Sequence, residues 1–272
     1  MTVDEALAHA RERIESAEAK LLLRHVLGCP AAELVAHPER ELAKSQSSRY
    51  AELVARRAAG EPIAYLVGYR EFYGRDFRVT PAVLIPRPET ELLVEVALGK
   101  VSRGHTARIL DLGAGSGCVA ITLALELDCE VTAVDVSPET LAVARDNAAR
   151  FGAHVNFVES DWFSAIDGEF DLIVGNPPYV AEGDKHLSEG DLRFEPAAAL
   201  ACGADGLSAI RRILTEAPRY LKPGGWLLLE HGYDQAEAMR TLLTETGFTD
   251  IEQHRDLAGI VRVSGGRRAE EG

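Results

Sequence analysis

The chain has 272 residues, enough for one large domain or two smaller ones, and its 46% hydrophobic and 26% charged residues are typical of a soluble globular protein. The formal net charge of −14 argues against broad electrostatic binding of nucleic acid, which requires clustered Lys and Arg. The four scattered cysteines, the acidic N-terminus and the lack of any apolar run near the ~18 residues of a membrane span predict a cytoplasmic protein with free thiols, no metal site and no membrane association.

The N-terminal part of the chain is predicted to be a small helical bundle. A first amphipathic helix is expected over residues 3–28, because apolar residues recur at spacings of three and four and Gly28 is a stop signal. Two further helices are expected over residues 33–42 and 47–59, the first of them broken near Pro38. The apolar face of the first helix would comprise Leu7, Ala10, Ile14, Ala17 and Leu21.

A β-hairpin is predicted to follow the bundle. Apolar residues alternate with polar ones over residues 72–79 about a turn at Gly74. We expect the extended pattern to continue to residues 83–85 and a helix to cover residues 90–96.

Strands and helices alternate from residue 108 onward, which predicts a parallel sheet covered on both faces. The last two strands are joined by a short loop and should be antiparallel, and the polar chain from Gly265 onward is expected to be disordered. The predicted strands cover residues 109–110, 131–134, 155–158, 172–174, 225–229, 249–254 and 260–263. The predicted helices cover residues 118–126, 138–150, 207–221 and 235–246.

A glycine-rich turn, Asp111-Leu112-Gly113-Ala114-Gly115-Ser116-Gly117, links the first of these strands to its helix. Glycines let a backbone turn sharply and approach a ligand closely, although tight turns also use glycine for structural reasons alone. Asp135 ends the next strand, where an acidic residue can accept hydrogen bonds from ribose hydroxyls. A dinucleotide is the alternative ligand, but its fingerprint requires glycine or alanine where Cys118 stands. The Asp111 carboxylate would repel a pyrophosphate and favour a cation, so S-adenosyl-L-methionine, with its sulfonium and ammonium groups, fits better.

Trp162 follows the third strand in the stretch Ser160-Asp161-Trp162-Phe163, near the expected position of an adenine. A Trp after a strand is more often a core residue than part of a ligand site. Its place at the carboxyl edge of the sheet leaves both interpretations open.

The motif Asn176-Pro177-Pro178-Tyr179 comes just past the end of a buried strand, at the edge where open α/β sheets bind ligands. The prolines fix φ and remove two backbone donors, which leaves the carbonyl groups of Asn176 and Pro177 free to accept hydrogen bonds. The Asn176 side chain adds an acceptor, and Tyr179 adds a flat aromatic face. A planar –NH2 group suits this cluster, so we interpret Asn176 and Tyr179 as catalytic residues. A proline-stiffened loop without function is the alternative.

With these motifs the chain resembles the release factor glutamine methyltransferases. The resemblance implies an α/β fold with a Rossmann-like, seven-stranded class I methyltransferase domain over residues 91–272. It also implies a helical substrate-docking domain over residues 1–70 and a β-hairpin linker over residues 71–90. The segments that carry it are residues 62–68, 85–91, 111–117, 176–179, 194–196 and 203–207.

The resemblance further implies methylation of the glutamine side-chain amide in the Gly-Gly-Gln motif of bacterial class I peptide chain release factors. The cofactor would be S-adenosyl-L-methionine and its product S-adenosyl-L-homocysteine. By motif match, residues 113–117, Asp135, Trp162 and Asn176 would contact the cofactor, and residues 176–179 would hold the glutamine.

Three alternatives remain open at the level of the sequence. The first is the same chemistry on a ribosomal protein. The second is a DNA adenine methyltransferase, which the acidic balance and the lack of a basic target-recognition segment disfavour, so no direct nucleic acid binding is expected. The third is a catalytically silent cofactor-binding module.

Overall fold

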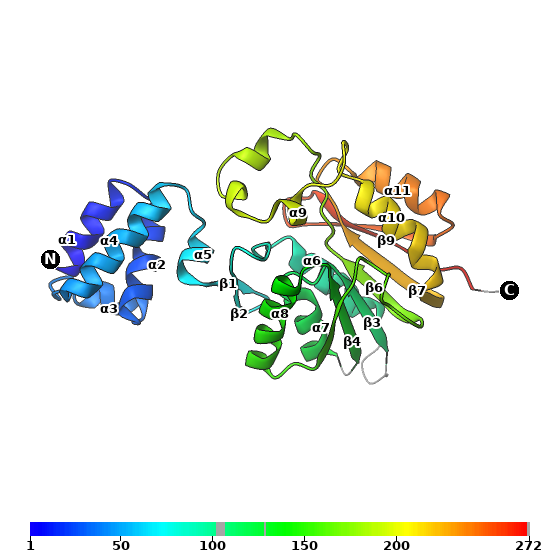
Figure 1. The fold of residues 1–272 in the computed structure, drawn as a ribbon, viewed down its shortest axis with the longest axis horizontal. Helices are drawn as coiled ribbons and strands as arrows, with labels where there is room; N and C mark the ends of the chain where they lie inside the picture. Colours follow the sequence, from blue (N-terminus) through cyan, green and yellow to red (C-terminus); the bar gives the residue numbers. More distant parts are fainter. Residues whose placement is uncertain (102–106, 128, 271–272) are drawn as a thin grey trace. The chain divides into compact units, whose positions relative to one another are not determined.

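The computed structural model of the chain divides into two compact units (Figure 1). We call them the helical unit, Met1–Tyr69 with Glu189–Phe194, and the sheet unit, Arg70–Ser188 with Glu195–Gly272. The structure describes residues 1–101, 107–127 and 129–270. In these residues no helix has both the length and the apolar character needed to cross a membrane.

The helical unit contains five helices in its described part. They are α1 Val3–Arg11, α2 Ser16–Leu27, α3 Ala31–Ala36, α4 Lys44–Ala58 and α5 Ile63–Val67. Gly28 ends α2 in the left-handed conformation, as predicted. The helix predicted over residues 33–42 is confirmed only as far as Ala36, because the chain after Pro38 is not helical. The Tyr50 hydroxyl of α4 donates to the Ala19 carbonyl oxygen of α2 at 3.0 Å, which ties these two helices together.

The prediction of one helix over residues 3–28 is wrong, because the chain forms two helices with a break between them. At the break the Ala10 carbonyl oxygen accepts hydrogen bonds from the Arg13 and Ile14 N–H groups, each at 3.0 Å, and the helix stops. After the break the apolar face of α2 lies at a different position around the helix than the unbroken pattern predicts. Ala17 is therefore exposed. Because an amphipathic helix must bury its face against another element, two short helices can pack where one long helix could not. The residues that α2 buries are Ala19, Leu22 and Leu23.

Residues 189–194 belong to the helical unit although they come from the later part of the chain. Arg57 of α4 donates to Asp191 at 2.8 Å and to Glu18 at 2.9 Å. Arg193 donates to the Ala59 carbonyl oxygen at the end of α4. Sequence periodicity gives no sign of this return.

The predicted hairpin is confirmed by β1 Tyr69–Phe72 and β2 Arg75–Arg78. Tyr73 and Gly74 between them have φ of 52° and 72°, the pair of left-handed residues that a two-residue type I′ turn requires. The predicted continuation to residues 83–85 as a strand is wrong. Val83 and Ile85 are buried all the same, in an irregular segment, so their apolar character reflects burial and not strand pairing.

The sheet unit is built on a seven-stranded sheet of order β5-β4-β3-β6-β7-β9-β8 (Figure 1). The strands are β3 Arg108–Leu112, β4 Glu130–Asp135, β5 Val155–Glu159, β6 Phe170–Gly175, β7 Leu221–Glu230, β8 Thr249–Arg255 and β9 Val261–Arg267. The first five are parallel, and β9 is antiparallel to both β7 and β8. This confirms the predicted fold class and the antiparallel closing pair.

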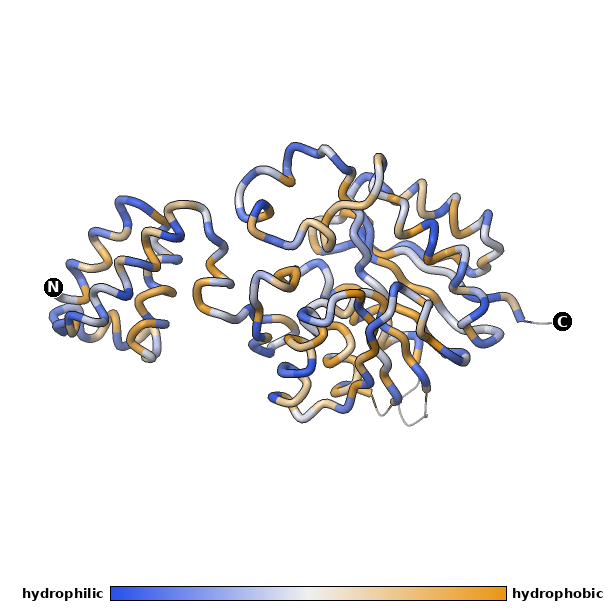
Figure 2. The backbone as a smooth tube through the Cα atoms, in the orientation of Figure 1, coloured by the Kyte–Doolittle hydropathy of each residue, from blue (hydrophilic) through white to orange (hydrophobic). Residues whose placement is uncertain are grey.

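Helices cover both faces of this sheet. One buried cluster joins the sheet to α6, α7 and α8, and a second joins it to α10 and α11. Figure 2 shows the hydrophobic stretches along the central strands that these clusters bury. The bounds are α6 Thr90–Lys100, α7 Cys118–Glu126, α8 Pro138–Phe151, α9 Ala197–Leu200, α10 Ser208–Glu216 and α11 Ala236–Glu245.

Two predicted segments near the C-terminus are corrected. The helix predicted over residues 207–221 ends at Glu216, because Pro218 lies in a 3-10 turn and Leu221 already pairs with Phe170 in the sheet. Disorder from Gly265 onward is wrong for residues 265–267, which pair with β7. A Cβ on Gly265 would lie 2.3 Å from the Leu227 carbonyl oxygen, so this glycine permits close strand approach. Residues 271 and 272 lie outside the described residues.

Asn147 of α8 is expected to contribute strongly to the stability of the sheet unit. Its buried side chain accepts from the Arg78 N–H at 2.8 Å and donates to the carbonyl oxygens of Arg78 and Ser116 at 3.0 and 2.9 Å. Asn147→Ala should lower the free energy of unfolding by about 2–4 kcal/mol, because it leaves buried backbone groups unpaired. Urea denaturation measures this. The matched control is Asp146→Ala, which removes only an exposed ion pair to Arg78 and should cost under about 0.5 kcal/mol. Equal losses in the two variants would contradict the assignment.

Candidate active site

Three parallel strands end side by side and define one edge of the sheet. Leu112 at the end of β3 pairs with Val134 of β4 and with Gly175 of β6. The residues that follow these strands therefore emerge together at the carboxyl edge, where open α/β sheets bind ligands. A cavity of about 500 Å³ opens at this edge.

Most of the residues predicted to bind ligands line this cavity. Those that do are Asp111, Gly113, Ala114, Gly115, Ser116, Asp135, Trp162, Asn176 and Pro178. Gly117, Pro177 and Tyr179 are not part of the lining. The lining also includes residues for which the sequence suggested no role, namely residues 81–84, Arg87, Thr90, Val136 and Pro196.

The glycine-rich turn presents backbone to the cavity in a fixed conformation. Gly113 and Gly115 have φ of 83° and 53°, which other residues adopt only with strain. The N–H groups of Gly113 and Ala114 donate to the Val134 carbonyl oxygen at 2.9 and 2.7 Å. Gly117 serves packing instead, since a Cβ there would lie 2.8 Å from the Ile121 side chain.

Asp135 is held in place by the backbone on both sides. One carboxylate oxygen accepts from the Gly115 N–H at 3.1 Å and the other from the Ser137 N–H at 3.0 Å. Burial raises the pKa of Asp135, while these backbone hydrogen bonds act in the opposite direction. The carboxylate is thus oriented before any ligand arrives.

Asp111 is a buried acid with few nearby groups that stabilise its negative charge. It is 2% exposed, and one carboxylate oxygen accepts from the Ala120 N–H of α7 at 3.2 Å. Burial raises its pKa to about 7, and the nearby charge of Asp135 adds to the effect. A bound cation would stabilise the ionised form.

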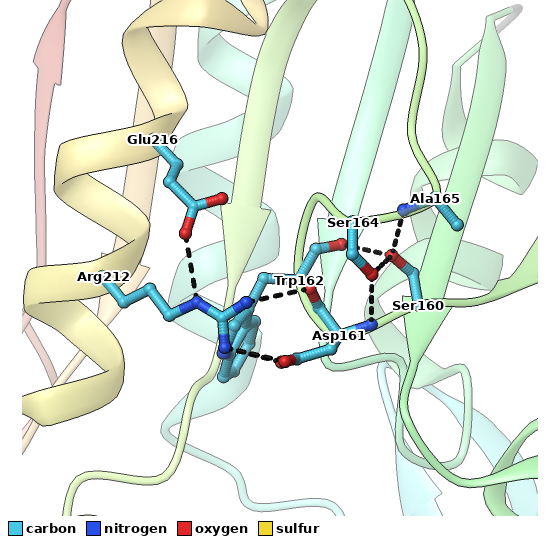
Figure 3. A network of polar contacts seen from close by, with 7 residues as sticks. All are labelled: Ser160, Asp161, Trp162, Ser164, Ala165, Arg212 and Glu216. Atoms are coloured by element: carbon cyan, nitrogen blue, oxygen red, sulfur yellow. Dashed lines mark hydrogen bonds and ion pairs between the residues drawn. The ribbon is translucent and has the colours of Figure 1, made fainter.

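Trp162 is one of three non-glycine residues with a left-handed backbone in the described part of the chain, at φ 54°. Such a conformation costs about 1–3 kcal/mol and persists only where the surroundings impose it. Figure 3 shows the contacts that do so: Arg212 of α10 donates to both Asp161 carboxylate oxygens at 2.9 and 2.8 Å. The Ser160 hydroxyl donates to the Trp162 carbonyl oxygen at 2.9 Å. These hydrogen bonds hold the strained turn in one conformation. The Trp162 side chain lines the cavity.

Asn176 is oriented by a residue distant in sequence. Its side-chain Nδ2 donates to the Thr90 hydroxyl oxygen at 3.2 Å, and Thr90 is the first residue of α6. This leaves the side-chain carbonyl oxygen of Asn176 as an acceptor at the cavity.

Tyr179 is anchored by a buried acid. Its ring packs against the hydrophobic cluster under α10 and α11, and its hydroxyl donates to Glu230 Oε1 at 3.2 Å. Burial raises the pKa of Tyr179, and the adjacent Glu230 charge raises it further. Glu230 ends β7 and is 1% exposed. The sequence pattern alone does not distinguish this buried Glu from one at an exposed strand end.

Glu195 is a second buried acid without a role in the sequence prediction. One carboxylate oxygen accepts from the Ile85 N–H at 3.0 Å, and the other binds the Arg87 guanidinium. Arg87 lines the cavity, so Glu195 secures one wall of it. Its motif with Phe194 and Pro196 was visible in the sequence, but its partner was not.

Comparison with known proteins identifies the family. Residues 4–68 match the PrmC N-terminal domain model, and residues 88–200 match the methyltransferase small domain model. A release factor glutamine methyltransferase from Burkholderia pseudomallei is 51% identical over 263 residues, covering 93% of this chain and 92% of the relative. Another, from Neisseria gonorrhoeae, is 48% identical over 271 residues and covers 98% of both chains. The chain belongs to the release factor glutamine methyltransferase family.

The same comparisons confirm the predicted enzyme class and fold. Among solved structures, a methyltransferase from Pyrococcus furiosus aligns with a TM-score of 0.54 at 24% identity, covering 79% of this chain and 97% of that one. At this level of identity the likeness shows the fold of this methyltransferase and no more.

Asp111 should make the unliganded methyltransferase less stable as pH rises. Its folded pKa of about 7 lies above the ordinary 3.8, so the stability it contributes is present below pH 4 and lost as pH rises through 7. Asp111→Asn should therefore be more stable than the parent at pH 8, by on the order of 3 kcal/mol, and equal to it near pH 4. Denaturant titrations across this range measure the difference.

The control for this measurement is Asp171→Asn, which should behave in the opposite way. Burial raises the pKa of Asp171, but the hydrogen bonds from Lys222 and the Arg108 N–H outweigh it, so the pKa lies below its ordinary value. Its stabilising effect is thus present at neutral pH and lost in acid. If Asp111→Asn showed the same pH dependence as Asp171→Asn, the burial argument for Asp111 would be wrong.

Proposed function

We propose that this methyltransferase methylates the side-chain amide nitrogen of the glutamine in the Gly-Gly-Gln motif of peptide chain release factors. The cofactor would be S-adenosyl-L-methionine, and S-adenosyl-L-homocysteine would be released. The observation that carries the proposal is the hydrogen bond from Asn176 Nδ2 to Thr90, since it orients the side chain and leaves its amide oxygen free to accept from an N–H group at the cavity. Family membership supports the choice of substrate.

The residues of the cavity fit this cofactor. Its volume of about 500 Å³ lies in the usual range for small-molecule sites. Asp135 would accept hydrogen bonds from the ribose hydroxyls, and Asp111 would face the positive charge of the amino acid part. Trp162 would provide an apolar surface for the adenine. When bound, the cofactor supplies a methyl group on a positively charged sulfur.

The protein's contribution to the reaction would be orientation. An amide nitrogen is a poor nucleophile, because its lone pair is delocalised into the carbonyl group. In our proposal the Asn176 side-chain oxygen and the Pro177 carbonyl oxygen each accept one N–H of the substrate amide. This aims the nitrogen and raises its electron density, while the Tyr179 ring fixes the amide plane. Orientation of this kind, in a site that excludes water, can account for several kcal/mol of the barrier. After transfer the nitrogen is acidic, and its proton would leave along the hydrogen bond to one of these accepting oxygens and pass from there to solvent.

The test of the substrate is transfer to purified release factors. Incubation with S-adenosyl-L-methionine should add one methyl group, which peptide mass spectrometry should locate on the Gly-Gly-Gln glutamine. A release factor with that glutamine replaced by alanine is the control and should stay unmodified. Ribosomal proteins and adenine-containing duplex DNA are assayed in parallel as alternative substrates. Transfer to either at a comparable rate would overturn the proposal.

Two substitutions separate the proposed substrate contact from the proposed cofactor contact. Asn176→Ala should lower turnover about 100-fold at saturating substrates, because it removes one preorganised acceptor worth on the order of 3 kcal/mol. Asp135→Ala should mainly weaken cofactor binding, since a ribose contact is made equally in the ground and transition states. Calorimetry and steady-state kinetics on folded variants distinguish the two. Turnover of Asn176→Ala within about threefold of the parent would refute the orienting role.

A further inference from the structure

A buried carboxylate oxygen without a partner lies beneath the Asn-Pro-Pro-Tyr motif. Glu230 is 1% exposed, and its Oε1 accepts from the Tyr179 hydroxyl. Its Oε2 has no hydrogen-bond partner among the residues that the structure describes. A buried acceptor left unpaired destabilises the folded protein, so its position next to the motif calls for a physical explanation.

The charges around Glu230 do not provide that explanation. Arg262 lies near enough to act on the Glu230 pKa, but its guanidinium pairs with Asp256 at 3.1 Å. Glu89 is close and repels the carboxylate. His231, the next residue, uses its ring nitrogens on the Ser264 hydroxyl and the Gly232 carbonyl oxygen. The side chains that act on Glu230 through hydrogen bonding are the hydroxyl groups of Tyr179 and Thr90.

The Thr90 hydroxyl is the donor that is still available. Its oxygen already accepts from Asn176 Nδ2 at 3.2 Å, so its own proton must be directed elsewhere. Thr90 stands close enough to Glu230 to lower the pKa of that carboxyl group, against the burial that raises it to about 7. The Thr90 hydroxyl has a proton to donate, and Glu230 Oε2 nearby lacks a donor.

The direction of this chain of hydrogen bonds decides which end of the Asn176 amide meets the substrate. A threonine hydroxyl can donate or accept, so Thr90 alone would tolerate either orientation of the amide. An ionised carboxylate can only accept. If it takes the Thr90 proton, the Thr90 oxygen can receive only a donor, and the Asn176 nitrogen must turn toward it.

We infer that Thr90 and Glu230 are positioning residues that fix the Asn176 side-chain oxygen toward the substrate amide. Glu230 accepts from the Thr90 and Tyr179 hydroxyls, Thr90 accepts from one N–H of Asn176, and the opposite end of the Asn176 amide, its oxygen, is turned toward the substrate. The inference rests on the proposed function, in which that oxygen accepts a substrate N–H. It extends the proposal to two residues that lie behind the motif, from α6 and β7.

The first test is a set of Thr90 variants. Thr90→Val keeps the shape and removes the hydroxyl, and turnover should fall about 10- to 100-fold because the amide is free to rotate. Thr90→Ser keeps the hydroxyl and should stay within about threefold of the parent. Cofactor affinity, measured by calorimetry, should fall far less than turnover in both variants, which a general loss of structure would not allow. Equal turnover in Thr90→Val and the parent would overturn the inference.

The second test is Glu230→Gln, which replaces the unpaired oxygen by an NH2 donor. Its new N–H should be directed at the Thr90 oxygen, so that Thr90 donates to Asn176 and the Asn176 amide turns round. Turnover should fall as far as in Thr90→Val, although the introduced glutamine is nearly the same size as the glutamate it replaces. Retention of full turnover by Glu230→Gln would also overturn the inference.

A third readout does not depend on methyl transfer. In a ¹⁵N-labelled sample, the side-chain NH2 signal of Asn176, assigned by its loss in Asn176→Asp, should show slowed hydrogen exchange. Thr90→Val should abolish this protection, and Thr90→Ser should keep it. Unprotected Asn176 protons in the parent would contradict the inference. If the parent leaves release factors unmethylated but shows the protected signal, the proposed function fails while the orientation of Asn176 stands.

Discussion

The register of three parallel strands is the constraint on which the rest of the site depends. Leu112 pairs with Val134 on one side and Gly175 on the other, so β3, β4 and β6 end at the same level. This alignment brings together a glycine turn, a carboxylate and an amide that are far apart in sequence. Small side chains allow the approach: a Cβ on Gly175 would lie 3.1 Å from the Leu112 carbonyl oxygen. A shift of one residue in the register would turn each of these groups to the other face of the sheet.

Two carboxyl groups at and behind the site are held by the folded chain in unfavourable surroundings. Asp111 and Glu230 are buried with pKa values of about 7, and Glu230 Oε2 has no hydrogen-bond partner among the described residues. Such groups lower stability at neutral pH in the unliganded protein. They are tolerated because large apolar clusters on both faces of the sheet supply most of the folding free energy. Local instability at the site is what a ligand with matching charge can relieve.

Chain connectivity links the motif to both units. From Asn176 to Tyr179 the chain belongs to the sheet unit, and at Glu189–Phe194 it belongs to the helical unit. The next residue, Glu195, returns to hold Ile85 and Arg87 at the cavity wall. Each unit therefore includes a part of the segment that follows the motif. Hydrogen bonds hold this segment in each of the two units.

The sequence by itself determined the alternation of strands and helices, the glycine turn, Asp135 at a strand end and the Asn-Pro-Pro-Tyr motif. These features follow from local chemistry: glycine and proline restrict the backbone in recognisable ways, and the spacing of apolar residues follows the period of each element. The break between α1 and α2 escaped prediction, because the apolar period runs through it and no glycine or proline marks it. What favours the break is packing against other helices, which a local pattern does not record.

Only the tertiary structure decided which polar groups meet. Thr90 lies 86 residues from Asn176, Glu195 lies 110 from Ile85, and Glu230 lies 51 from Tyr179. In the sequence each of these is an ordinary polar residue near the end of an element. Their roles arise from burial, which removes water as a partner and leaves every donor and acceptor to find another group of the chain. Which group that is depends on the pairing of strands and the packing of helices, and neither is encoded within a single segment.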